Sequence, residues 1–184
     1  MGTRAEYAPG PATGAQVEKH GEKWTIILVR ELRHPPQMVW QALIEPAQLR
    51  EWAPFEVDRS LGTPGATVEL TWVGTGHVSE ATVTRAEAPR ILEFGDLRWS
   101  LEPLGRGTRL TLWHSIDRRF VCWGAAGWHI ALDVLHRLLD GTPIGRLAGA
   151  DTMKLAAWKP LVAEYAEQFG TATPNPPPRA AQES

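Results

Sequence analysis

The chain has few of the residues that brace small secreted domains or attract nucleic acids. Its 184 residues include one cysteine, Cys122, so no disulfide can form within the chain, and a disulfide-framed secreted fold is excluded. The 19 basic and 21 acidic residues nearly cancel, which gives a formal net charge of −2. Because no strong positive field exists to gather phosphates, we expect no nucleic-acid partner.

Long apolar runs are also missing. No stretch approaches the roughly 20 apolar residues that a helix needs to span a bilayer. The first twenty residues contain glycine, proline, alanine and charges but no apolar core of the signal-peptide kind. We therefore expect no membrane span and a cytoplasmic location.

Motifs for metal binding, covalent catalysis and phosphate binding are absent as well. The six histidines, at positions 20, 34, 77, 114, 129 and 136, lack zinc-type spacing, and the single cysteine has no second thiol. The chain has no Gly-x-Ser-x-Gly nucleophile motif and no glycine-rich phosphate loop followed by lysine. We predict no metal, no cofactor and no identifiable catalytic residue. Whether the chain is an enzyme stays open, and a binding protein is favoured.

What the chain does have is tryptophan. Nine tryptophans accompany only two tyrosines and four phenylalanines. Tryptophan combines a large apolar body with one N–H group that needs a partner when it is buried. So many of them in one chain of this length indicate a roomy, aromatic-lined interior or an interface.

Composition divides the chain into one domain and two tails. Residues 1–21 are rich in glycine, alanine and proline without periodicity, and residues 171–184 contain a proline cluster followed by polar residues. Such segments bury too little apolar surface to fold, so both are predicted to be disordered. The folded domain is predicted to span residues 22–170.

The first two thirds of the domain favour strands. The β-branched, apolar segment 24–32 predicts a strand. After two prolines, Val39, Trp40 and Leu43 follow at helical spacing, and a second short helix is predicted from Glu45-Pro46 to Trp52. From residue 55 to residue 116 apolar and polar residues alternate, with turn residues between the segments. The short connections require antiparallel pairing, and the count is about six strands in addition to the first.

The last third returns to a helical period. Residues 121–139 have an apolar stripe with spacings of three and four, and Gly141 is placed to end this helix. A second helical stretch covers residues 158–169, where Pro160 indicates a break or a new start. The order predicts an α+β domain in which one face of a curved sheet of about seven strands covers the apolar stripe of the long helix.

Several local motifs are similar to those of the SRPBCC, or START-like, superfamily, and among its families most similar to the heat shock protein ATPase activator homologue-like family. The stretches that carry the resemblance are Arg30-Glu31-Leu32-Arg33-His34-Pro35-Pro36, Val39-Trp40-Gln41-Ala42-Leu43, Glu45-Pro46 through Leu49 to Trp52, Pro89-Arg90-Ile91-Leu92-Glu93-Phe94, Gly107-Thr108-Arg109-Leu110-Thr111-Leu112 and Gly127-Trp128-His129 with Leu132-Asp133. The resemblance covers about residues 24–169. It implies a helix-grip fold, in which the curved antiparallel sheet wraps around the long C-terminal helix.

A helix-grip fold implies a cavity between the sheet and the long helix. Inward positions of the predicted strands and the helical stripe supply the residues expected to line it, and aromatic-lined gaps are where small ligands bind. These residues are Trp72, Trp99, Leu101, Leu112, His114, Trp128, Leu132 and Leu135. The same tryptophans would equally serve as core filling, because burial stabilises them in either case.

The polar candidates have two interpretations each. His114 lies on the inward side of its strand, as a polar anchor for a ligand or as a core histidine with a backbone partner. On the long helix, His129, Asp133 and Arg137 recur every four residues, and so do His136 and Asp140. These residues indicate either acid–base groups at a pocket mouth or ordinary charged support along a helix.

Three functions are compatible with this pattern. The favoured one is a protein that binds an apolar small molecule, such as a lipid or a polyketide, between sheet and helix. The second is a protein–protein regulator of the chaperone ATPase activator type, with a homodimer or another protein as partner; an exposed apolar patch around Trp113, Phe120 and Trp123 would support it. The third is an enzyme of the polyketide cyclase or aromatase kind, which needs titratable groups such as His114 with His129 or Asp133 to converge in the cavity.

Overall fold

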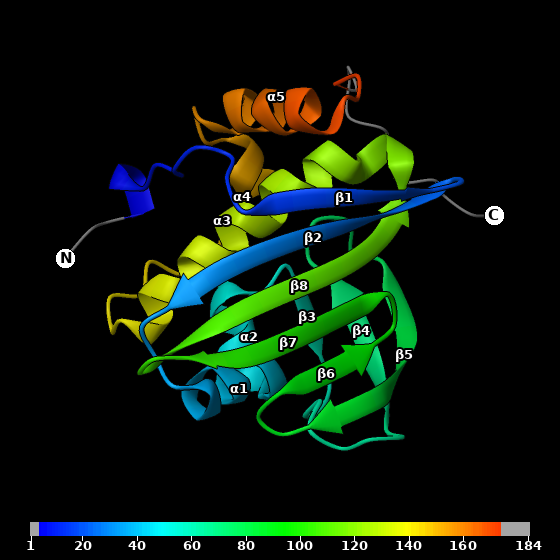
Figure 1. The fold of residues 1–184 in the computed structure, drawn as a ribbon, viewed down its shortest axis with the longest axis vertical. Helices are drawn as coiled ribbons and strands as arrows, with labels where there is room; N and C mark the ends of the chain where they lie inside the picture. The colour runs from blue at the N-terminus through cyan, green and yellow to red at the C-terminus, as the bar shows by residue number, and fades with distance from the viewer. Residues whose placement is uncertain (1–3, 174–184) are drawn as a thin grey trace.

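The computed structural model describes residues 4–173, which form a curled antiparallel sheet that grips one long helix (Figure 1). The strands are β1 (Ala15–His20), β2 (Lys23–Leu32), β3 (Phe55–Val57), β4 (Thr67–Trp72), β5 (Val78–Glu87), β6 (Ile91–Phe94), β7 (Leu97–Leu104) and β8 (Gly107–Asp117). The helices are α1 (Pro36–Ile44), α2 (Pro46–Trp52), α3 (Val121–Leu139), α4 (Ala150–Met153) and α5 (Trp158–Phe169), with single 3₁₀ turns at Arg4–Glu6 and Arg118–Phe120.

The eight strands lie in the order β1-β2-β8-β7-β6-β5-β4-β3. Every neighbouring pair is antiparallel, as the short connections between residues 55 and 116 predicted. The α+β helix-grip architecture is therefore confirmed, with one strand more than the seven or so that the sequence predicted.

The additional strand corrects part of the predicted N-terminal tail. Ala15–His20 form β1, which pairs with β2 along its whole length, and Tyr7 is also buried. β1 has no apolar alternation because it is an edge strand with four of its six residues exposed. Main-chain hydrogen bonds to β2 hold such a strand in place, and they leave no trace in the hydrophobic pattern. Of the predicted C-terminal tail, residues 171–173 have no helix or strand and the rest lies outside the described residues.

The helices begin and end at the prolines and the glycine from which the sequence predicted their ends. Pro36 and Pro46 each occupy the first turn of a short helix, where a missing N–H group costs nothing. The long helix α3 ends at Leu139, and Gly141 follows it in the left-handed region with φ of 74°. Helix α5 begins at Trp158, so that Pro160 falls in its first turn and marks a new start.

Helix α3 lies across the concave face of the sheet, with α5 packed on its outer side (Figure 1). At one point the helix touches the sheet closely, because a Cβ atom on Gly124 would lie 2.7 Å from Ile116 Cδ1 and 2.9 Å from Ile26 Cδ1. The curl of the sheet brings β3 and β4 round to the same helix, where Phe55 and Trp72 reach Trp128. The core is thus a single cluster enclosed by α3, the sheet and helices α1 and α2.

We predict that Leu132→Ala lowers the free energy of unfolding by about 2–5 kcal/mol, because it opens a cavity under α3. Leu132 is 2% exposed. The matched control is Leu104→Ala at the 36% exposed end of β7, which should cost well under 1 kcal/mol. Urea unfolding followed by circular dichroism measures both. Equal effects of the two substitutions would contradict the packing of α3 against the sheet.

Candidate functional site

An aromatic cluster occupies the space between α3 and the sheet. Trp128 projects from α3 and makes edge-to-face contacts with rings from three different strands. Its ring centroid lies 5.4 Å from that of Trp99 on β7, 6.3 Å from Phe55 on β3 and 6.4 Å from Trp72 on β4. Such pairs stabilise beyond their buried area, and each holds the next ring in one orientation.

One polar side chain, His114 on β8, is built into this cluster. The Trp128 indole Nε1 donates a hydrogen bond to His114 Nδ1 over 2.9 Å. The Trp72 ring stacks on the imidazole, with centroids 5.5 Å apart and planes 13° from parallel. The hydrogen bond and the stacked ring together hold the imidazole in one plane.

Burial keeps His114 neutral. Loss of solvation lowers its pKa from the ordinary 6.5 to about 4, while the distant charges of Asp96 and Lys23 act in opposite directions. A neutral imidazole that accepts at Nδ1 carries its proton on Nε2. One interpretation from the sequence was a core histidine bonded to a backbone carbonyl. The predicted backbone partner is wrong, because His114 is bonded to the Trp128 side chain.

The structure brings all eight predicted lining residues into one core. Their exposure, however, is uneven. Trp99, Leu101, Leu112, Trp128, Leu132 and Leu135 are at most 2% exposed. His114 retains 9% and Trp72 is half-buried, so the cluster is sealed at one end and less tightly closed at the other.

Sequence reasoning missed Phe55 as a member of this cluster. Its ring lies 5.7 Å from both Trp72 and Phe94, in addition to its contact with Trp128. The alternation of Phe55 with Val57 gave the available signal, but which face of a three-residue edge strand is buried depends on the curl of the sheet.

The less tightly closed end of the cluster is bordered by the β4–β5 hairpin. Trp72 is the last residue of β4, and Gly74 in the following turn touches Gly149 just before α4. A Cβ atom on Gly149 would lie 2.6 Å from Gly74 Cα, and its φ is 56°, so only glycine fits this crossing. The crossing sets the position of the hairpin, and with it the position of Trp72, against the chain between α3 and α4.

The charged residues of α3 lie on its other side and bind the N-terminal segment. The Tyr7 hydroxyl donates to Asp133 Oδ2 over 2.7 Å, and His129 lies between Asp133 (3.5 Å) and the Tyr165 hydroxyl (2.9 Å). Burial tends to raise the pKa of Asp133, but the hydrogen bonds from His129 and Tyr7 outweigh it and leave the pKa below its ordinary value. Burial beside the ionised Asp133 raises the pKa of Tyr7 well above its ordinary value.

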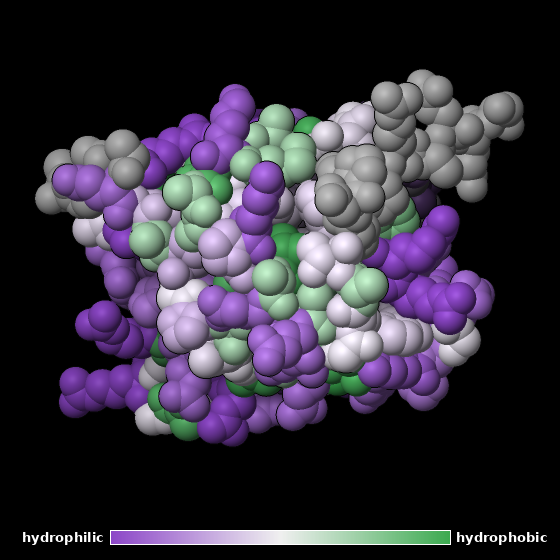
Figure 2. All heavy atoms as spheres, turned by 90° about the horizontal axis from the view of Figure 1, so that it is seen from above, coloured by the Kyte–Doolittle hydropathy of each residue, from purple (hydrophilic) through white to green (hydrophobic). Residues whose placement is uncertain are grey.

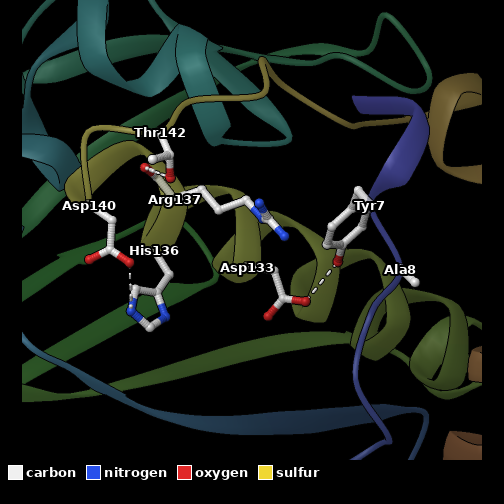
Figure 3. A pocket seen from close by; sticks show the side chains of 7 residues that line it. All are labelled: Tyr7, Ala8, Asp133, His136, Arg137, Asp140 and Thr142. Carbon is white, nitrogen blue, oxygen red and sulfur yellow. Dashed lines mark hydrogen bonds and ion pairs between the residues drawn. The ribbon is translucent and has the colours of Figure 1, made fainter. Parts of the chain in front are cut away.

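An open, polar pocket of about 280 Å³ lies along this side of α3 (Figure 3). Its lining residues are Tyr7, Ala8, Asp133, His136, Arg137, Asp140 and Thr142. Arg137 points towards Tyr7, with its guanidinium carbon 5.7 Å from the ring centroid, and His34 Nε2 lies 2.7 Å from Asp140 Oδ1. Since His129 packs on Tyr165 of α5 and His114 on Trp128, the two histidines do not meet in one cavity.

The aromatic residues predicted to form an exposed patch are each partly covered. Arg98 stacks on Trp113 with its guanidinium carbon 4.8 Å from the ring centroid, Arg119 covers Phe120, and Trp123 packs on Trp158. On the face shown in Figure 2, hydrophobic residues occur in small groups between charged ones.

Within residues 4–173, no group of three or more His, Cys, Asp or Glu side chains is placed to hold a metal ion. No helix in the same range is long and apolar enough to cross a bilayer.

Comparison with known proteins identifies the family. The model of the Activator of Hsp90 ATPase homolog 1-like proteins matches residues 33–140, which is more than half of the chain. The chain belongs to this family. This match confirms the family that the sequence motifs predicted, and with it the SRPBCC superfamily to which the family belongs.

Solved structures with the same fold include CalU16 from Micromonospora echinospora, with 22% identity, a TM-score of 0.60 and coverage of 89% of this chain and 97% of that one. A conserved protein of unknown function from Enterococcus faecalis, EF2215, has 18% identity and a TM-score of 0.62 and covers 85% and 91%. DynU16, described as a putative protein in the dynemicin biosynthetic locus, has 22% identity and a TM-score of 0.56 and covers 66% and 49%. The search of curated proteins found no match to this chain.

We predict that His114 makes the protein less stable in mild acid. The unfolded chain takes up a proton near pH 6.5, whereas the folded chain does so only near pH 4. The free energy of unfolding therefore keeps this contribution above pH 6.5 and loses up to about 3 kcal/mol of it as the pH falls to 4. His114→Gln, which still offers Trp128 an acceptor, should show a smaller loss over this range in urea unfolding. The same loss in both proteins would contradict a buried, neutral His114.

A second prediction concerns the N-terminal segment. Tyr7→Phe removes the donor to Asp133 and should lower the free energy of unfolding by about 1–3 kcal/mol, because the acceptor is a partly buried carboxylate. Amide exchange in residues 8–14 should also become faster. The double variant with Asp133→Asn tests the pairing, since its cost should fall short of the sum of the two single costs. Strict additivity would show that the two side chains do not interact.

Proposed function

We propose that this protein binds a hydrophobic small molecule between the sheet and α3, at the Trp72–His114 end of the aromatic cluster. The observation that carries the proposal is the uneven closure of the cluster. Trp99 and Trp128 are sealed at 1% and 2% exposure, while Trp72 is half-buried and His114 keeps 9%. An apolar ligand at this end would bury the remaining ring surface, at about 25 cal/mol for each Å² removed from water.

The chemistry of the wall supports a small molecule as the ligand. Flat rings from β4 and α3 meet there at steep angles, with a single oriented polar group, His114, between them. Apolar walls with a few positioned polar groups are typical of small-molecule sites. A protein described as belonging to the dynemicin biosynthetic locus has the same fold, which is consistent with a biosynthetic small molecule as the ligand.

The alternatives have less support in the structure. A chaperone regulator is implied by the family's name, and the aromatic residues proposed as its contact patch are partly covered by Arg98, Arg119 and Trp158. A cyclase-type enzyme needs two titratable groups at the ligand, and His129 is held by Tyr165 and Asp133 on the other side of α3. Binding without reaction is therefore the proposed activity.

We predict that the purified protein binds apolar compounds saturably and that Trp72→Ala weakens this binding about tenfold or more, which corresponds to ~1.4 kcal/mol. Mass spectrometry of an organic extract identifies a co-purified compound, and equilibrium dialysis with fatty acids and flat aromatic compounds measures affinity. Trp113→Ala is the matched control. Trp113 lies under Arg98, and because successive residues of a strand point to opposite faces of the sheet, its side chain points away from the face that contains His114. An empty extract together with no saturable binding would refute the proposal.

A further inference from the structure

We propose that His114 selects a neutral, flat ligand with a hydrogen-bond acceptor such as a ketone or quinone oxygen, which it contacts through Nε2–H. This inference rests on the proposed function, because it names the class of ligand that the Trp72–His114 end of the cluster takes. Its basis is the hydrogen bonding of His114, in addition to the exposure that supports binding itself.

The first step is the direction of the hydrogen bonds. An indole N–H can only donate, so the Trp128 contact makes Nδ1 of His114 an acceptor and places the imidazole proton on Nε2. Within residues 4–173, Nε2 has no hydrogen-bond partner. His114 as a whole keeps 9% of its surface exposed, so its side chain is not sealed off from a ligand. The donor is therefore open to contact from outside the protein.

The second step is the orientation of this donor. The imidazole is stacked on Trp72, with planes 13° apart, and meets Trp128 edge to face at 89°. A ring held on two sides does not turn to find a partner, so Nε2–H points in one direction. An acceptor on the ligand must lie in the imidazole plane. A flat ligand that is coplanar with the imidazole lies nearly parallel to the Trp72 ring and can stack on it beside His114.

The third step excludes charged ligands. The pKa of His114 is about 4, so the site has no positive charge from this residue at neutral pH. The rings within contact distance are Trp72 and Trp128, which supply no cation. The charge of Lys23 acts on His114, but Lys23 is paired with Asp96 over 3.5 Å. A carboxylate bound against this wall would exchange its hydration shell for hydrogen bonds from neutral donors only, which is unfavourable for a charged group. Fatty acids are therefore expected to bind less well than neutral carbonyl compounds of similar size.

The test uses three compounds that share one tricyclic ring system and differ at one carbon: fluorene, 9-fluorenone and 9-fluorenecarboxylate. Equilibrium dialysis gives the dissociation constant of each for the full chain and for His114→Leu, which removes the donor. The ratio of the fluorenone affinity to the fluorene affinity should fall about 5- to 10-fold in His114→Leu, as expected for one neutral hydrogen bond. His114→Gln, which keeps an acceptor for Trp128 and a donor for the ligand, should retain most of the ratio. His20→Leu, at a 76% exposed side chain, is the matched control and should not change it.

Nuclear magnetic resonance of the unsubstituted protein gives a second readout that needs no variant. Fluorenone should shift the His114 Nε2–H resonance downfield, whereas fluorene should leave it nearly unchanged. If both compounds bind but the ratio is the same in His114→Leu, or if the carboxylate binds best, this inference is overturned and the proposed function stands. If neither compound nor any other apolar probe binds, both fail.

Discussion

The packing of Trp128 inside the curled sheet is the contact on which the rest of the interior depends. This one side chain, from the middle of α3, touches rings on β3, β4 and β7 and donates its only hydrogen bond to β8. A buried indole N–H without a partner would be costly, so the position of His114 and the position of α3 constrain each other. The helix and the sheet can therefore approach only in the arrangement that joins these two groups.

The two sides of α3 have separate roles as a result. The side that faces the sheet is aromatic and apolar, and the histidine that it meets there, His114 of β8, is held neutral by burial. The outer side is polar. Asp133 accepts a hydrogen bond from Tyr7 of the N-terminal segment, and His129, which also contacts Asp133, bonds to Tyr165 of α5. With this division, polar contacts on the outer side of α3 stabilise the domain, and the cluster on its inner side stays aromatic and apolar.

The architecture and the family followed from local patterns. The three- and four-residue spacing of α3, the alternation in β4, β7 and β8 and the prolines before α1 and α2 all report burial or backbone restriction of neighbouring residues. Such signals depend on a few positions along the chain, so a single sequence contains them in full. They were enough to place His114, Trp72, Trp99 and Trp128 on the same inner surface.

The sequence by itself determined the order of elements from β2 to α3, the inward face of the long strands in this range and the apolar stripe of α3. The tertiary structure decided which polar groups meet: Tyr7 bonds to Asp133 across 126 residues, and Trp128 reaches the Nδ1 rather than the Nε2 atom of His114. It also decided that the polar segment Ala15–His20 is an edge strand. The physical reason is the same in each case. Hydrogen bonds between distant groups depend on where the curl of the sheet brings the chain, and no period along the sequence records that geometry.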